Sequence, residues 1–139
     1  MEEKYTAIRK EALKAREKSY CPYSKFAVGA ALLSKGNAVY TGANIENASY
    51  GATVCAERTA FFKAVSEGET EFEAIAIAGG KKGEKPVDYA YPCGVCRQVM
   101  REFCNPASFK IFVVISENEY EEYTLEEMLP KSFGPDNLK

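Results

Sequence analysis

Three cysteines and one glutamate have the types and the spacing of a catalytic metal site. Cys55 and Glu57 stand in Cys-Ala-Glu-Arg, and Cys93 and Cys96 stand in Pro-Cys-Gly-Val-Cys. Zinc binds thiolates readily, and a catalytic zinc site leaves one of its four positions open for water. The chain has no histidine, so its ligands must be thiolates or carboxylates. The three thiols therefore predict a zinc site with an open position.

The spacing of the thiols suits a shared metal. Cys93 and Cys96 are three residues apart, so they lie on one face of a helical turn. Cys55 begins another expected helix, and a helix N-terminus stabilises the negative charge of a thiolate. The two remaining cysteines, Cys21 and Cys104, have no partner motif. We predict that both are small buried apolar residues.

Glu57 and Arg58 have side chains that could assist a metal bound by Cys55. Glu57 is too close to Cys55 along the chain to bind the same ion comfortably. Its carboxylate instead suits a general acid and base beside the water that the metal activates. Three thiolates leave a zinc centre with excess negative charge. Arg58 is predicted to offset this charge by donating hydrogen bonds to the sulfurs.

Two other kinds of protein use a Cys-x-x-Cys motif. Taken alone, Cys93 and Cys96 are as typical of a structural zinc site or a thiol-redox site as of catalysis. A non-catalytic zinc-binding or redox module predicts that Glu57 is dispensable. The addition of Cys55 and Glu57 favours the catalytic interpretation.

Hydrophobic periodicity and turn residues predict the elements that position these residues. The expected helices are 3–18, 55–65, 93–103 and 124–127, and the expected strands are 26–33, 38–45, 72–78, 110–116 and 120–123. This order predicts an α/β domain with a mixed sheet and helices on its faces. The lysine- and glycine-rich loop 79–88 is the segment we expect to be mobile.

Composition limits the classes of partner. The 139 residues predict a single domain, 1–139. The net charge of −2 argues against nucleic acid as the substrate, because phosphate binding requires a basic surface. The N-terminus lacks a secretory signal, and no apolar run approaches the roughly 20 residues that span a bilayer. Cytoplasm is then the default, and five cysteines, an odd number in a reducing compartment, argue against a disulfide framework. We therefore expect a cytoplasmic protein with a small substrate and no membrane partner.

The motifs resemble those of the small, homotetrameric, zinc-dependent cytidine deaminases. Cys-Ala-Glu-Arg-Thr-Ala and Pro-Cys-Gly-Val-Cys-Arg-Gln carry this resemblance. Segments 21–31, 44–50 and 129–133 also resemble the family. The resemblance implies a three-layer α-β-α fold with a mixed sheet of about five strands. It also implies a homotetramer in which neighbouring subunits complete each pocket. Each subunit would hold one Zn²⁺ through Cys55, Cys93 and Cys96.

The resemblance also implies a reaction, the hydrolytic deamination of cytidine and 2′-deoxycytidine to uridine and 2′-deoxyuridine with release of ammonia. Zinc-bound hydroxide would attack C4 while Glu57 moves protons. Residues implied in substrate binding are Asn44 and Glu46 for the ribose, Phe26 for the ring, the Ala56 N–H for O2, and Tyr50 and Phe133 for a neighbouring pocket. The spacing of Asn44 and Glu46 suits this role, because positions i and i+2 of a strand share a face. Rival substrates are a modified or antibiotic nucleoside and a polynucleotide.

Overall fold

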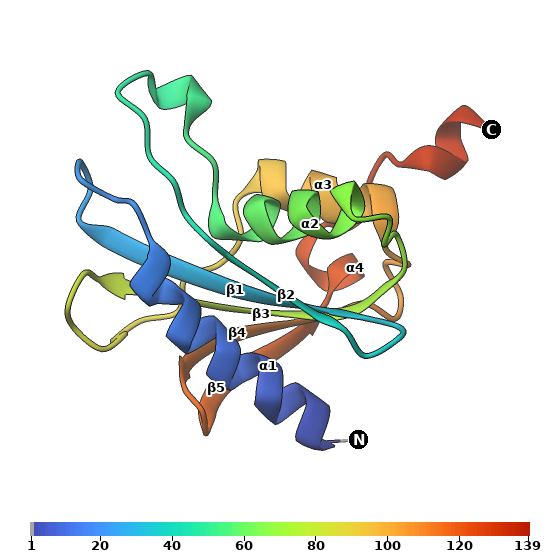
Figure 1. Ribbon diagram of the computed structural model, residues 1–139. Helices are drawn as coiled ribbons and strands as arrows, with labels where there is room; N and C mark the ends of the chain where they lie inside the picture. Colours follow the sequence, from blue (N-terminus) through green and yellow to red (C-terminus); the bar gives the residue numbers. More distant parts are fainter. Residues whose placement is uncertain (1) are drawn as a thin grey trace.

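A five-stranded sheet lies at the centre of the fold (Figure 1). The computed structural model describes residues 2–139. The strands are β1 (Phe26–Ser34), β2 (Val39–Ala43), β3 (Phe72–Lys81), β4 (Lys110–Ser116) and β5 (Glu119–Thr124), in the order β2-β1-β3-β4-β5. Strands β3 and β4 are parallel and are connected through a helix, whereas the other neighbouring strands are antiparallel. The predicted mixed five-stranded sheet is confirmed.

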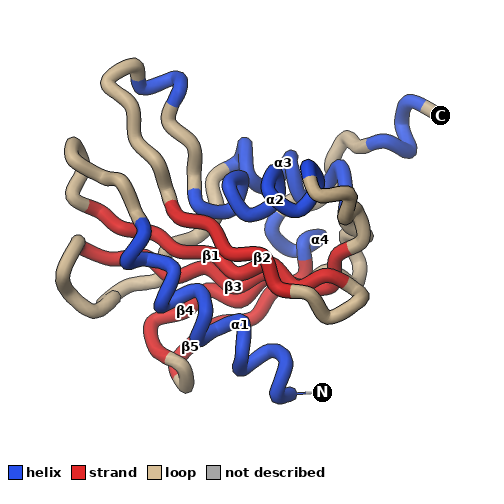
Figure 2. Tube along the Cα trace, viewed as in Figure 1, coloured by secondary structure: helices blue, strands red, loops and turns tan. Residues whose placement is uncertain are grey.

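Helices cover both faces of this sheet (Figure 2). The helices are α1 (Glu2–Ala15), α2 (Ala56–Ser66), α3 (Gly94–Phe103) and α4 (Leu125–Met128), with 3₁₀ turns η1 (Arg16–Lys18), η2 (Tyr50–Ala52) and η3 (Pro135–Leu138). Helix α1 lies across one face, and α2, α3 and α4 lie on the other. This arrangement is the expected α-β-α layering. Within residues 2–139, no helix is both long enough and apolar enough to cross a membrane.

Two apolar clusters hold the layers together. Strands β1, β3 and β4 are almost continuously buried, because helices cover both of their faces. Successive strand residues point to opposite faces, so Leu32 packs beneath α2 and α3 while Leu33 packs beneath α1. On the α2 face, the Phe61 ring contacts the rings of Phe72 and Phe109. The side that bears the metal motifs therefore rests on a closely packed core.

The element boundaries differ from the predicted ones in ways that matter for the site. Helices α2 and α3 begin one residue later than expected, so Cys55 and Cys93 are N-cap residues. The first helix changes to a 3₁₀ turn after Ala15. Strand β2 ends at Ala43, so the prediction that Asn44 and Glu46 share a strand face is wrong.

Two glycines allow close approaches near the metal motifs. A Cβ atom on Gly42 of β2 would lie 2.5 Å from the Ala60 backbone nitrogen, so glycine lets α2 lie directly on the sheet. A Cβ atom on Gly79 would lie 2.7 Å from the Ala90 side chain and 2.9 Å from the Phe26 ring. The prediction that β3 ends before Gly79 is also wrong, because the strand continues to Lys81.

Candidate active site

The fold brings the three predicted thiols together. Cys55 caps α2, while Cys93 caps α3 and Cys96 lies in its first turn. The three sulfurs all lie within 4.8 Å of one another, and those of Cys55 and Cys93 are 3.9 Å apart. Two helix N-termini thus converge on one point, which favours negative charge there. Cys21 and Cys104 are buried elsewhere, in agreement with their predicted packing role.

The Cys55 sulfur loses its proton more readily than an ordinary thiol, because its pKa is lowered. A hydrogen bond from Cys96 lowers the pKa of Cys55 to about 5, and a hydrogen bond from Arg58 acts in the same direction. Partial burial opposes both. The same shared hydrogen bond and burial raise the pKa of Cys96. The Cys55–Cys96 pair therefore holds a proton that a metal ion would displace, because a metal binds the thiolate form.

Arg58 faces the cluster as predicted from its position. Its Nη2 atom donates a hydrogen bond to the Cys55 sulfur at 3.5 Å. Its Nε atom is buried and has no hydrogen-bond partner among the residues that the structure describes. The guanidinium therefore places positive charge against the sulfurs. This contact supports an anionic thiolate cluster rather than three neutral thiols.

Glu57 lies at the base of the same site. Its side chain is 4% exposed, in the first turn of α2. Burial raises the pKa of Glu57 to about 7, with a further increase from Cys55, while its own backbone N–H and Arg58 act in the opposite direction. A carboxyl group that titrates near neutral pH can both accept and donate a proton in that range.

A cavity opens directly onto the cluster. Its volume is about 320 Å³, near the lower end of the range for small-molecule pockets. The lining residues come from β1, β3, the position after β2, the end of the 46–54 loop, the N-terminus of α2 and the segment before α3: Phe26, Val28, Asn44, Thr53, Val54, Cys55, Ala56, Glu57, Ile77, Ala90, Tyr91 and Cys93. The walls are mainly apolar, and the polar groups include Glu57, Asn44, Thr53 and the sulfurs of Cys55 and Cys93. Such a cavity suits one small ring held beside the metal.

The donor set fits zinc. Tetrahedral zinc with Zn–S bonds of about 2.3 Å places its sulfurs about 3.8 Å apart, close to the 3.9 Å between Cys55 and Cys93. Cys55, Cys93 and Cys96 are the one group of three potential ligands found within residues 2–139. Three ligands leave the fourth position free for water or substrate.

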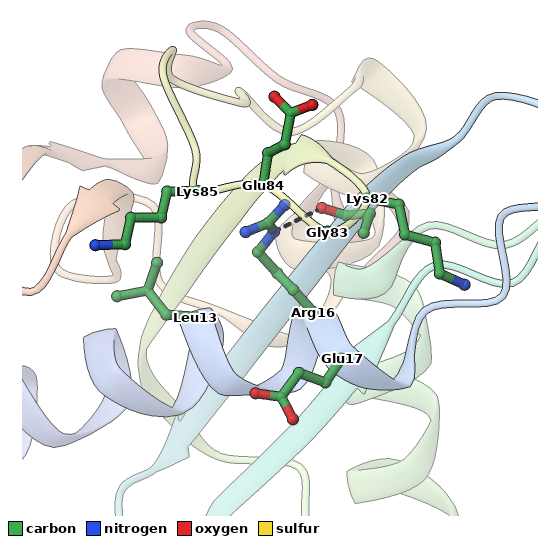
Figure 3. A pocket seen from close by; sticks show the side chains of 8 residues that line it. Leu13, Arg16, Glu17, Lys82, Gly83, Glu84 and Lys85 are labelled. Carbon is green, nitrogen blue, oxygen red and sulfur yellow. Dashed lines mark hydrogen bonds between the residues drawn. The ribbon is translucent and has the colours of Figure 1, made fainter.

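A larger cavity, of about 480 Å³, lies away from the thiols (Figure 3). It lies between the end of α1 and the loop after β3, and Lys82, Lys85, Glu17 and Glu84 contribute charges of both signs. Figure 3 shows the ends of these four side chains spread outward rather than converging. The Arg16 guanidinium there donates to the carbonyls of Ala27 and Lys81, at 2.9 and 3.2 Å. No cysteine is among the described residues that line this cavity.

Comparison with known proteins agrees with the thiol cluster. The family model of the cytidine and deoxycytidylate deaminase zinc-binding region matches residues 2–112. A cytidine deaminase of Halalkalibacterium halodurans is 51% identical over 129 residues, which cover 93% of each chain.

The chain belongs to the cytidine and deoxycytidylate deaminase family. Two crystal structures of family members extend the likeness to the fold. The cytidine deaminase of Burkholderia pseudomallei has a TM-score of 0.81 and 42% identity, covering 91% of this chain and 97% of its own. That of Mycobacterium tuberculosis has a TM-score of 0.79 and 36% identity, covering 94% and 97%. Because the matching region is the zinc-binding region of the family, zinc is the metal of the thiol cluster.

The remaining predicted site residues of this deaminase-family chain lie farther out. Glu46 and Tyr50 line a neighbouring cavity of about 330 Å³, together with Thr53, which also borders the cavity at the cluster. Tyr50 is 78% exposed and Phe133 is 58% exposed. Neither aromatic residue lines the cluster cavity of its own chain.

Arg97 is a structural neighbour of the metal site that the sequence prediction missed. Its Nε donates to the Pro92 carbonyl, and its Nη1 donates to the Met128 carbonyl, both at 2.7 Å. It thereby fixes the residue before Cys93 relative to α4. Its position one residue after Cys96 was the signal that could have indicated this role.

Proposed function

We propose that this chain is a cytidine deaminase that hydrolyses cytidine and 2′-deoxycytidine to uridine and 2′-deoxyuridine, with release of ammonia. The observation that carries the proposal is the buried Glu57 beside three converging sulfurs at the base of a small apolar cavity. The relatives named cytidine deaminase support the substrate class. A single domain, 1–139, carries the site, and its unpaired thiols suit the cytoplasm.

Cys55, Cys93 and Cys96 would hold the zinc, which would supply a Lewis acid that activates water near neutral pH. Glu57 takes a proton from this water and delivers it to N3 of cytosine. The water oxygen bonds to C4, a further proton passes through Glu57 to the amino group, and the C4–N bond breaks. Uridine and ammonia together contain all the atoms of cytidine and water.

The surrounding residues orient the base. Phe26 and Val28 of β1 provide an apolar wall for the pyrimidine ring. Ala56 lies at the first position of α2, so its N–H is available to bind the carbonyl O2 of the base. Arg58 holds the Cys55 sulfur and keeps the cluster charge balanced.

Asn44 and Glu46 retain hydrogen-bonding capacity that suits a sugar hydroxyl. Asn44 donates to the Phe26 carbonyl at 2.9 Å, and its Oδ1 accepts from Val28 N–H and Ser19. Glu46 accepts from the N–H groups of Tyr23 and Ser24 and from the Ser24 hydroxyl. An amide has two donors and a carboxylate about four acceptor positions. One N–H donor of Asn44 and one acceptor position of Glu46 are therefore not used by these bonds. A sugar hydroxyl can accept from the first and donate to the second.

A substrate series tests this assignment. Cytidine and 2′-deoxycytidine should both be consumed, because both have the 3′-hydroxyl that we place between Asn44 and Glu46. We expect 3′-deoxycytidine to show a KM about tenfold higher, the typical effect of one lost hydrogen bond to a charged group. Cytidine 5′-monophosphate should also be a poor substrate for an acidic chain. Equal efficiency for all four compounds would contradict the ribose contact.

The active assembly is a homotetramer in which neighbouring subunits complete each pocket. Two segments project from the body of the fold, the 46–54 loop and the C-terminal segment after α4 (Figure 1). Each carries an exposed aromatic residue, Tyr50 and Phe133. Exposed rings on projecting segments are suited to burial against another copy of the chain.

Phe133→Ala tests the shared pocket. We expect kcat/KM for cytidine to fall about tenfold while the zinc content remains unchanged, because a ring contributes about 1–2 kcal/mol of contact to the neighbouring pocket. Sedimentation or light scattering would report the assembly state beside the kinetics. Leu138→Ala, at an apolar residue near the end of the chain that is more exposed than Phe133 (78% against 58%), is the control. Equal kinetics for the two variants would contradict a pocket role for Phe133.

A further inference from the structure

Glu121 of the edge strand β5 accepts hydrogen bonds from two phenols. The hydroxyl of Tyr91 lies 2.7 Å from its Oε1 atom, and that of Tyr123 lies 2.8 Å from the same atom. Tyr123 is two residues farther along β5, so its side chain is on the same face as Glu121. Tyr91 comes from the segment before α3, thirty residues away in the chain. One carboxylate oxygen therefore connects the edge of the sheet to the chain that leads into Cys93.

Ring contacts support this connection. The Tyr91 ring contacts the rings of Tyr89 and Tyr123, with centroids 6.3 Å apart in both pairs. Tyr89 and Tyr123 are partly buried against the core cluster beneath α2 and α3. Tyr91 is 50% exposed and borders the cavity at the thiols. Its ring is thus held from one side by packed neighbours and at its tip by Glu121.

The segment that Tyr91 holds carries the most exposed of the three zinc ligands. Cys96 is buried and Cys55 is partly buried, whereas Cys93 is exposed and lies outside the helical part of α3. Arg97 fixes the Pro92 carbonyl from the helix side. The Tyr91 hydroxyl provides the corresponding attachment on the sheet side. The position of the Cys93 sulfur therefore depends on contacts from both directions.

We propose that Glu121 is a positioning residue for the zinc site, acting through Tyr91 on segment 89–92 and hence on Cys93. Groups that orient a ligand without touching the metal strengthen metal binding and shape the site. The expected effect on zinc binding depends only on the thiol cluster and does not require that the protein deaminates cytidine. The effect on cytidine binding rests on the proposed function, because Tyr91 borders the cavity in which we place the base.

Zinc release to a chelator from the zinc-loaded protein tests the proposal without any substrate. We expect Glu121→Ala to accelerate release roughly fivefold, since the hydrogen bond that holds the Tyr91 hydroxyl to the carboxylate is lost. Glu121→Gln should release zinc at nearly the wild-type rate, because an amide oxygen can still accept from both phenols. Tyr91→Phe keeps the ring but removes the hydroxyl, so its rate should resemble that of Glu121→Ala.

The controls separate positioning from general destabilisation. Glu122→Ala removes the neighbouring carboxylate of β5, which pairs with Lys110 at 2.8 Å, and should leave the release rate unchanged. The double variant Tyr91→Phe with Glu121→Ala should release zinc no faster than either single variant, because the two changes remove one shared contact. Thermal unfolding of each chelator-treated variant reports stability separately.

Several results would overturn the proposal. The first is an equal zinc-release rate for Glu121→Ala and Glu122→Ala. The second is a release rate in the double variant that is the product of the two single effects. The third is a release rate for Glu121→Gln as high as that for Glu121→Ala. If Glu121→Ala does not fold, Tyr91→Phe and Glu121→Gln still give the comparison. Absence of cytidine turnover in the wild type would contradict the proposed function but leave these zinc-release predictions intact. With turnover present, Glu121→Ala should raise the KM for cytidine about threefold with a smaller effect on kcat.

Discussion

Glu57→Gln is expected to lower kcat for cytidine by about a thousandfold or more while the protein retains its zinc. General acid–base catalysis contributes about two to four orders of magnitude to a rate. In the proposed mechanism the Glu57 carboxylate serves both proton transfers, so its loss should give an effect in the upper part of that range. Glutamine has nearly the same volume and fits the buried position, where the side chain is 4% exposed. Steady-state kinetics with metal analysis of the same sample would measure both quantities.

Two further variants show whether the effect belongs to the carboxylate of Glu57. Glu67→Gln makes the same change at the exposed C-terminal end of α2 and should have wild-type kinetics. Glu57→Asp retains the charge but withdraws it by one methylene group, so we expect an intermediate rate. If Glu57→Gln loses its zinc, the kinetics of Glu57→Asp are compared with those of the wild type instead. Full activity in zinc-loaded Glu57→Gln would refute the assigned role.

Cys96→Ala is expected to abolish both zinc binding and turnover. Cys96 is 1% exposed in the first turn of α3, so no water-filled space beside it can supply a replacement ligand of similar strength. Two thiolates hold zinc much more weakly than three, and we expect the affinity to fall by more than about a hundredfold. Because zinc binds the folded chain, the added stability that zinc provides should also disappear. Zinc titration and thermal unfolding with and without added zinc would measure these changes.

Cys104→Ala is the matched control for this variant. Cys104 is also buried, at the C-terminal end of the same helix, but lies outside the group of potential ligands. Removing its sulfur should lower the unfolding temperature slightly through lost packing and leave zinc affinity unchanged. Equal zinc affinity in Cys96→Ala and Cys104→Ala would contradict the assigned ligand set.

The sequence predicted the parts of this protein that depend on short-range patterns. Cys55, Glu57 and Arg58 lie in one helical turn, and Cys93 and Cys96 in another, so their local geometry follows from spacing alone. The alternation of apolar strands and helices was sufficient to predict the mixed sheet. That both helix N-termini point to one place required the resemblance or the structure, because thirty-eight residues separate Cys55 from Cys93.

Features that depend on contacts between distant segments were missed. The predicted strand through residue 45 ended at Ala43, since the Asn44 side chain accepts from the Val28 N–H and donates to Phe26. Gly79 was predicted to lie beyond the end of a strand. It instead lies within β3, where the absence of a side chain lets the Phe26 ring approach the backbone. The pairing of Tyr91 with Glu121 depends on the position of the edge strand β5 in the sheet. No local pattern encodes that position.

Turnover of cytidine by the zinc-loaded protein tests the central claim most directly. Ammonia release and the loss of cytidine absorbance should be followed in one sample of known zinc content. We predict one ammonia and one uridine for each cytidine consumed, with activity that disappears on chelation and returns when zinc is added. A folded protein with zinc in its thiol cluster that leaves cytidine unchanged would contradict the assignment of this site as a deaminase centre.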